Sequence, residues 1–324
     1  MTVTVEDIRA AAERIKPVVV RTPLLRADAL DELIGARVFV KAENLQRFGA
    51  FKIRGAFNTL ASLASDVRAR GVVAFSSGNH GIGVAGAAKH FGVPAAIVMP
   101  ADTPAAKRGQ IAKLGGEVIT YDRATEDREA IGAKLSAERG ATLVRPFDDE
   151  RVIAGQGTIG LEIVAQLAEQ SLTPDVVLTG ASGGGLAGGV ATALNAEAPS
   201  ARVFVVEPAG HDDLGRSLAS GKRERNAPGV RSICDALLVD TPGAITFEIA
   251  RRLIAGAYVV TDDQALRAMA LAFAHLKIAL EPSGAIGIAA ALANREQVAG
   301  KTIVIIASGG NVDPETFLKA LARV

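Results

Sequence analysis

The chain has 324 residues, enough for one large domain or two ordinary ones, and its 36 lysines and arginines nearly balance its 35 aspartates and glutamates. This balance, without a sustained basic block, argues against nucleic acid as a partner, and the single cysteine, Cys234, excludes an internal disulfide. Because no apolar run approaches the length of a membrane span, we expect a cytoplasmic protein with no membrane partner.

The first part of the chain predicts helices and a compact sheet. Residues 1–15 have the apolar spacing of an amphipathic helix rather than of a secretion signal. From residue 71 onward, short β-branched runs alternate with alanine-rich segments of helical period, which is typical of parallel sheets covered by helices. The pattern predicts a unit of four strands, in VVAFSS, AAIVMP, EVITYD and TLVRPF.

A second series of elements follows and predicts a separate, larger sheet. Its helices include residues 186–194 and 263–275, and its strands lie in DVVLTGAS, RVFVVEP, AYVVTD and TIVIIASGG. The order of the elements divides the chain near residues 70 and 149. We therefore expect a large domain built from residues 1–70 and 149–324, and a small mobile α/β domain over residues 71–148.

Three glycine-rich turns follow predicted strands, in SSGNHG, GASGGGLAGG and ASGGN. Open parallel sheets bind ligands beyond the carboxyl ends of their strands. Bare amides in a turn that leads into a helix favour an anion, so residues 181–185 are a candidate phosphate site. The alternative is that these glycines only allow a strand to turn tightly into a helix.

The same segment also allows a different function. Gly183, Gly185 and Gly188 satisfy GxGxxG after a strand, and Glu207 ends the next strand about where a ribose-binding acid belongs. An NAD-dependent oxidoreductase therefore stays open as an alternative. Such an enzyme, however, has no need of the other two glycine turns or of the segment around Lys52.

Lys52 lies between Phe51 and Ile53 at the expected start of a helix. Apolar neighbours disfavour the charged form of a lysine and lower its pKa, as a lysine that reacts with a carbonyl group requires. The alternative is a helix lysine whose ammonium group reaches water. Composition alone does not decide between the two.

Five motifs together carry a resemblance to a known family. They occur in the order and spacing of fold-type II pyridoxal-phosphate enzymes, and most resemble those of serine/threonine dehydratases and serine racemases. The motifs are AFKIRGA at 50–56, SSGNHG at 76–81, the loop at 181–185, EPSGA at 281–285 and SGGNVD at 308–313. The resemblance implies an α/β fold like that of the tryptophan synthase β subunit: two open, mostly parallel twisted sheets flanked by helices, with the cofactor between the domains.

The resemblance also implies the site. Lys52 holds pyridoxal 5'-phosphate covalently and removes the α-proton of the substrate, Asn79 bonds the ring hydroxyl, and Ser308 meets the ring nitrogen. The implied cofactor residues are Phe51, Lys52, Asn79, Ala181, Ser182, Gly183, Gly184, Gly185, Glu281 and Ser308. The implied substrate residues are Ser76, Ser77, Asn79, His80 and Arg128, and the implied catalytic residues are Lys52 and Ser77.

The implied reaction is a β-elimination that converts L-threonine or L-serine into a 2-oxo acid and ammonia. A neutral Ser308 beside the ring nitrogen makes the ring a weaker electron sink, which elimination tolerates. Serine racemases resembling this chain carry a serine at Ser77, which acts as the acid and base opposite the lysine. Racemisation of serine and dehydration of 3-hydroxyaspartate therefore stay open, and Ala50, where a serine is usual, leaves the substrate preference undecided.

A second site and an assembly are also implied. Glu207 and Asp213 match positions that bind a divalent cation in serine racemase relatives, and oxygen ligands suit Mg²⁺ or Ca²⁺. The alternative is a solvated acidic turn. Relatives are commonly dimers or tetramers, so we expect a homodimer or homotetramer that acts on a small-molecule amino acid. Because the chain ends soon after SGGNVD, we expect no C-terminal regulatory domain.

Overall fold

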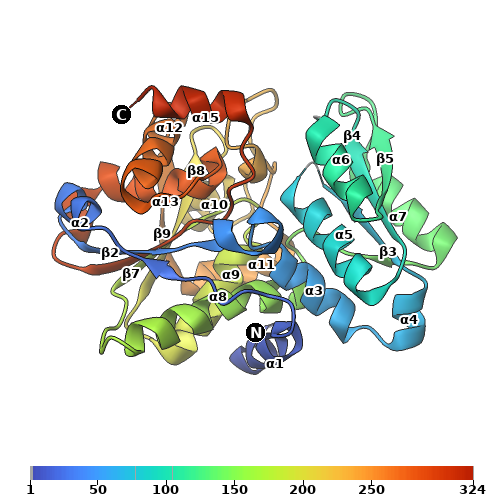
Figure 1. Cartoon of the computed structure of the whole chain (residues 1–324), viewed down its shortest axis with the longest axis horizontal. Helices are drawn as coiled ribbons and strands as arrows, with labels where there is room; N and C mark the ends of the chain where they lie inside the picture. The colour runs from blue at the N-terminus through green and yellow to red at the C-terminus, as the bar shows by residue number, and fades with distance from the viewer. Residues whose placement is uncertain (1–2, 77, 104, 324) are drawn as a thin grey trace.

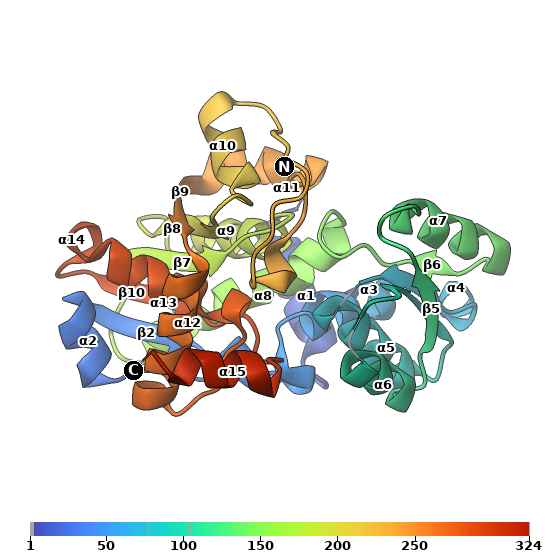
Figure 2. The same cartoon turned by 90° about the horizontal axis from the view of Figure 1, so that it is seen from above.

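The computed structural model describes residues 3–76, 78–103 and 105–323, and these form two sheets, each flanked by helices (Figure 1). The larger sheet and its helices lie on the left of Figure 1 and the smaller sheet on the right. Figure 2 shows the same two lobes side by side from above. The two mostly parallel sheets confirm the predicted fold class.

The smaller sheet is the predicted four-strand unit. Its strands are parallel and run in the order β5 (Glu117–Tyr121), β4 (Ala95–Pro100), β3 (Val72–Phe75) and β6 (Thr142–Leu143). Successive residues of a strand point to opposite faces, so Val72 and Ala74 pack under α5 (Asn79–Phe91) while Val73 and Phe75 pack near α7 (Arg128–Arg139). The helix α6 (Ala105–Lys113) joins β4 to β5.

The larger sheet has six strands, of which only β1 is antiparallel. The sequence predicted four of them but not β1 or β2, which come from the N-terminal part of the chain. Their order is β1 (Leu24–Leu25), β2 (Arg37–Lys41), β10 (Thr302–Ile306), β7 (Val176–Gly180), β8 (Arg202–Pro208) and β9 (Ile254–Val260).

Helices cover both faces of the larger sheet. On one face, buried side chains of the sheet pack with those of α2 (Asp28–Ile34), α12 (Asp262–Leu271), α13 (Pro282–Ala293) and α15 (Pro314–Leu321). On the other face they pack with α8 (Glu150–Ala168) and α9 (Gly185–Glu197). The helix α1 (Val5–Ile15) lies against α8 and α9 and begins with the side chain of Thr4 accepting the Asp7 amide. The remaining helices are α4 (Ser65–Ala69), α10 (Asp213–Ser220), α11 (Ala244–Leu253) and α14 (Arg295–Val298).

The helix α3 (Ile53–Ser62) packs on both lobes. Ile53, Phe57 and Leu60 are buried in one cluster with residues of β3, β4 and α5, and that cluster also contains Val152 of α8. The division into a domain of residues 1–70 and 149–324 and a mobile domain of residues 71–148 stays a prediction. Within the described residues, no helix combines the length and the hydropathy needed to span a bilayer.

Candidate active site

A pocket lies between the two lobes, beyond the carboxyl ends of β3, β7 and β10. The glycine turns of both sheets therefore surround one space, which agrees with the rule that parallel sheets bind ligands beyond the carboxyl ends of their strands. Ser77 lies outside the described residues. The other predicted cofactor and substrate residues all line the pocket: Phe51, Lys52, Ser76, Asn79, His80, Arg128, Ala181, Ser182, Gly183, Gly184, Gly185, Glu281 and Ser308.

Lys52 directly precedes the first residue of α3, as the sequence predicted. Its Nζ donates a hydrogen bond to the carbonyl oxygen of Pro146 at 2.8 Å and lies 5.1 Å from the centre of the Phe51 ring. Burial lowers the pKa of Lys52 to about 8, although the nearby Glu281 carboxylate opposes this. A larger share of the amine is therefore neutral near pH 7 than in an ordinary lysine.

The main chain before Lys52 is held by the turn after β10. The amide of Phe51 donates to the carbonyl oxygen of Ser308 at 3.1 Å, and Ala50 pairs with Gly309 in an isolated antiparallel bridge. The motifs that contain Ala50 and Ser308 thus lie side by side, although these two residues are 258 positions apart in the sequence. Ser308 itself is buried and lines the pocket.

The glycine loop after β7 presents free amides at the start of α9. The amides of residues 182–187 donate to no other described residue, and the first bond of the helix runs from Gly188 to Gly184. Gly184 needs to be glycine because its φ is +90°, and a Cβ at Gly183 would lie 2.3 Å from the ring of Phe147. Such unpaired amides at a helix start bind anions well. The amide of Ala181, in contrast, already donates to the Val206 carbonyl in the sheet.

A polar cluster, in which Glu281 is buried and the two asparagines are half-buried, joins the first residue of α5 to the start of α13. The side-chain amide of Asn79 donates to Glu281 Oε1 at 2.7 Å, and its oxygen accepts from Asn311 Nδ2 at 2.8 Å. Burial and the charge of Asp235 raise the pKa of Glu281 to about 7, while the bond from Asn79 opposes the shift. Glu281 therefore changes its charge near neutral pH, beside the predicted ring-hydroxyl ligand.

Ser76 and His80 hold the turn after β3. Ser76 Oγ accepts the amide of Gly78 at 3.1 Å, and His80 Nε2 lies 3.0 Å from the carbonyl oxygen of Val144. Burial and the charge of Lys52 lower the pKa of His80 to about 3, so the ring is neutral. Because Nε2 faces a carbonyl, it is the donor, and the buried Nδ1 is an acceptor with no partner among the described residues.

Arg128 brings positive charge to the pocket wall. Its guanidinium lies 5.6 Å from the centre of the Phe75 ring. Among the described residues, no acidic side chain forms an ion pair with it. A second carboxylate of a substrate would meet an uncompensated cation at this wall.

Several pocket residues had no signal in the sequence. Lys107 of α6 pairs with Asp235 at 2.6 Å, which joins the two lobes, and both residues line the pocket. Phe147 also lines the pocket and lies against Gly183, whose carbonyl oxygen accepts a hydrogen bond from the hydroxyl of Thr246, a residue behind the pocket wall. None of these residues belongs to a motif, and each becomes part of the site only through contacts between distant segments.

Glu207 and Asp213 lie outside the pocket. The Glu207 carboxylate accepts the amides of Leu214 and Gly215 at 2.9 and 2.8 Å, and burial raises its pKa to about 8. Asp213 Oδ1 accepts from Asn226 at 2.7 Å, whereas its buried Oδ2 has no partner among the described residues. Burial raises the pKa of Asp213 to about 6. Over the described part of the chain, no three His, Cys, Asp or Glu side chains are arranged to hold a metal.

Comparison with known proteins links this geometry to a family. The family model for pyridoxal-phosphate dependent enzymes matches residues 15–309. The chain is 40% identical to L-threo-3-hydroxyaspartate ammonia-lyase of Saccharomyces cerevisiae, over 97% of this chain and 95% of that protein. It is 41% identical to a serine racemase of Oryza sativa subsp. indica, over 98% and 94%. The crystal structure of a threonine deaminase from T.th. superposes with a TM-score of 0.90 at 41% identity, covering 96% of this chain and 99% of that one.

Proposed function

The chain belongs to the family of pyridoxal-phosphate dependent enzymes, and we propose that it dehydrates and deaminates a β-hydroxy amino acid, with L-threonine or L-serine as the first candidates. The products would be a 2-oxo acid and ammonia. The observation that carries this proposal is the meeting of a lysine of lowered pKa with a loop of free amides in one pocket.

The residues of the pocket fit the cofactor. Lys52 would hold it covalently, and the amides of residues 182–187 would bind its phosphate. Asn79 and Ser308 are proposed to bind its ring hydroxyl and ring nitrogen, with Phe51 packed near the ring and Glu281 bound to Asn79. When bound, pyridoxal phosphate supplies a conjugated ring that withdraws electrons from the α-carbon of the substrate.

Lys52 is also the proposed base. Its lowered pKa allows the amine to take the α-proton near neutral pH, and the carbonyl of Pro146 accepts one of its N–H groups. The α-carbon loses its proton to Lys52 and the β-carbon loses its hydroxyl, which takes up one proton and leaves as water, so that the elimination removes one water overall. Hydrolysis of the released enamine then consumes one water and gives the 2-oxo acid and ammonia. Ser308 supports this reaction because a neutral hydroxyl does not force protonation of the ring nitrogen.

The turn after β3 is the proposed site for the substrate carboxylate. The start of α5 presents amides that have no partner within the helix, and the helix dipole favours an anion there. Ser76, Ser77, Asn79 and His80 are the proposed contacts. The neutral His80 adds no charge, so recognition of the carboxylate rests on hydrogen bonds and on the dipole.

A second candidate function is the dehydration of 3-hydroxyaspartate, which has an additional carboxylate. Arg128 favours it, because this cation lines the pocket without an ion-pair partner among the described residues. Racemisation of serine rests on Ser77, outside the described residues, and on the likeness to the rice racemase. The dinucleotide alternative has less support, because both oxygens of Glu207 already accept amides of α10.

We also propose a cation site, an assembly and a location. The unpartnered Oδ2 of Asp213 beside Glu207 supports a site for Mg²⁺ or Ca²⁺, with main-chain or water oxygens completing its coordination. The resemblance to dehydratases and racemases supports a homodimer or homotetramer, and the amphipathic rather than secretion-signal character of residues 1–15 supports the cytoplasm. Sedimentation of the purified protein tests the assembly.

The test of the proposed function compares the wild type with Lys52→Ala. The wild type should be yellow, borohydride should fix the cofactor to Lys52, and ammonia should form from at least one of serine, threonine and the two diastereomers of 3-hydroxyaspartate. Lys52→Ala should lose the borohydride trapping of the cofactor and the release of ammonia, whereas Lys89→Ala, which changes an exposed lysine of α5, should keep both. Full turnover by Lys52→Ala would overturn the proposal, and so would a colourless wild type that binds NAD. A chiral assay of serine separates racemisation from elimination.

A further inference from the structure

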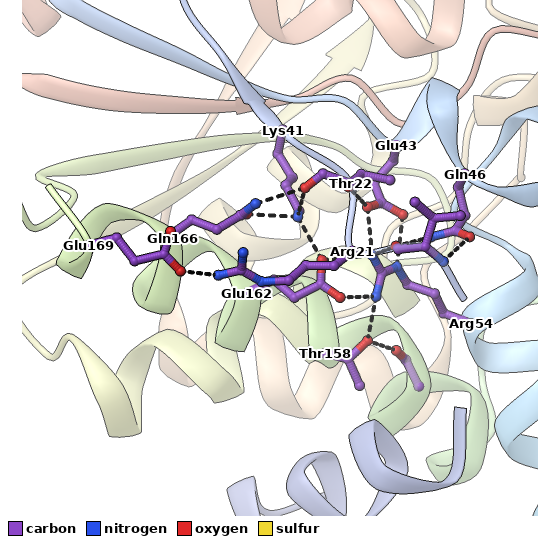
Figure 3. A network of polar contacts seen from close by, with 12 residues as sticks. Arg21, Thr22, Lys41, Glu43, Gln46, Arg54, Thr158, Glu162, Gln166 and Glu169 are labelled. Atoms are coloured by element: carbon purple, nitrogen blue, oxygen red, sulfur yellow. Dashed lines mark hydrogen bonds and ion pairs between the residues drawn. The ribbon is translucent and has the colours of Figure 1, made fainter. Parts of the chain in front are cut away.

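A buried network of charges lies at the start of α3, two residues from Lys52 (Figure 3). At its centre Arg54 is clamped between two carboxylates. Its Nε and Nη2 donate to Oε2 and Oε1 of Glu43, both at 2.8 Å. Its Nη1 and Nη2 donate to Oε1 and Oε2 of Glu162 at 2.7 and 2.9 Å.

The guanidinium has no rotational freedom in this position. Nη1 also donates to Thr158 Oγ1 and Nη2 to the carbonyl of Val20, so all three nitrogens of Arg54 have acceptors. The side chains of Arg54 and Glu43 are fully buried. Burial disfavours the charge of Arg54, but Glu43 and Glu162 outweigh this and raise its pKa, so the guanidinium stays charged at any physiological pH.

Lys41 balances the charge of the network. Its Nζ donates to Glu162 Oε2 at 2.6 Å, to Gln166 at 2.9 Å and to the carbonyl of Thr22. Two cations therefore face two carboxylates, and three of the four side chains are fully buried while that of Glu162 is 18% exposed. Such networks contribute little net stability, because desolvation offsets the attraction, so their main effect is to fix a geometry.

The partners of Arg54 all belong with the larger sheet. Glu43 lies two residues after the end of β2, and Glu162 lies on α8, which covers that sheet. The apolar side of α3, in contrast, packs with β3, β4 and α5 of the smaller lobe. The helix that begins beside Lys52 is thus bound to the larger lobe by charges and by further contacts with α8, and to the smaller lobe by apolar contacts.

From this arrangement we propose that Arg54 is a positioning residue that fastens the first turn of α3, and with it Lys52, to the larger sheet. On the other side of Lys52, the amide of Phe51 is bound to Ser308 of the same sheet. The two attachments hold the Lys52 amine at a fixed position relative to the turns after β7 and β10, independently of any movement of the smaller lobe. The inference rests on the proposed function of Lys52.

Two variants and one control test this role. Arg54→Lys keeps the charge but loses the planar fork that bonds both carboxylates. Glu43→Gln combined with Arg54→Met removes one charge of each sign, so that Lys41 and Glu162 still balance. The control is Arg21→Gln, which breaks the exposed pair with Glu169 at the edge of the same network in Figure 3.

In each Arg54 variant, with the cofactor bound, kcat should fall by about 10- to 100-fold, because displacing a reacting group by about 1 Å costs on the order of 100-fold in rate. KM should change less than about threefold, and the isotope effect with α-deuterated substrate should rise, since proton transfer to Lys52 becomes limiting. Hydrogen exchange over residues 50–62 should become faster. The control should match the wild type in all four measurements.

Wild-type kcat and exchange rates in Arg54→Lys would overturn the inference. So would a loss of kcat that follows only the fraction of unfolded protein, or one that Arg21→Gln shares. If the double variant does not fold, Arg54→Lys alone decides the question. Failure of the proposed function looks different, because then the wild type itself releases no ammonia. In that case, exchange over residues 50–62 and borohydride trapping of pyridoxal phosphate at Lys52 still decide whether Arg54 positions the lysine.

Discussion

Replacing Gly183 with alanine should weaken cofactor binding, because the new methyl group collides with Phe147. An ideal Cβ at position 183 lies 2.3 Å from ring atoms of Phe147, whereas carbon atoms in good contact are about 3.5–4.0 Å apart. The loop or the ring must therefore move by more than about 1 Å. Overpacking of this kind costs about 1–3 kcal/mol, which corresponds to roughly 5- to 150-fold in the Kd of pyridoxal phosphate if the loop gives way.

The assay is a titration of apoenzyme with pyridoxal phosphate, followed by visible absorbance, together with the Tm of each variant. A double-mutant cycle isolates the collision, because Phe147→Ala should restore most of the binding lost in Gly183→Ala. Gly184→Ala is the matched control. Its defect comes from a φ of +90°, so Phe147→Ala should not relieve it. Wild-type affinity in Gly183→Ala, or equal rescue of both alanine variants, would refute the reasoning.

Three further outcomes are expected. The rate of cofactor attachment to the apoenzyme should rise with pH, reach half of its maximum near pH 8 and level off above that, because the pKa of Lys52 is lowered to about 8; a rate still rising at pH 10 contradicts this. Arg128→Met should raise KM for threo-3-hydroxyaspartate about tenfold or more and KM for threonine little, as steady-state ammonia release will show, whereas equal changes would exclude a contact with the second carboxylate. Mg²⁺ or Ca²⁺ should raise the Tm of the wild type but not that of Asp213→Asn, and an unchanged wild-type Tm would rule out the cation site.

The sequence predicted the sheets and the wall of the pocket well. The strands around residues 72–100 and 176–208 follow from local periodicity, which depends only on neighbouring residues. The glycine turns could also be placed, because each follows a predicted strand and parallel strands end at one edge. The strand β2, Arg37–Lys41, was missed. It pairs with β10, whose residues lie far along the chain, so no neighbouring strand in sequence marked it.

The sequence alone could not predict the Arg54 network, for a related reason. Arg54 stands in the AFKIRGA motif, but its partner Glu162 is 108 positions away and Glu43 lies in a short turn. Charged residues are usually solvent-exposed, so a local pattern gives no ground to bury Lys41, Glu43 and Arg54 together. Only the packing of α3 against α8 brings these side chains into one place.

The predicted phosphate loop departs from the family pattern, and the structure shows why this departure has little effect on the number of amides that the loop offers. The resemblance to fold-type II pyridoxal-phosphate enzymes implies a loop of four glycines here, whereas this chain has Ala181 and Ser182 at the first two positions, and a Cβ narrows the backbone freedom that an anion site uses. At Ala181 this narrowing has no consequence, because its amide is a sheet donor to Val206 rather than part of the helix start. Glycine is present at the two positions where a side chain would not fit, which are Gly183 below the Phe147 ring and Gly184 with its positive φ. Ser182 leaves its own amide free and adds a hydroxyl to the pocket wall, so this loop offers an anion as many main-chain donors as an all-glycine one would.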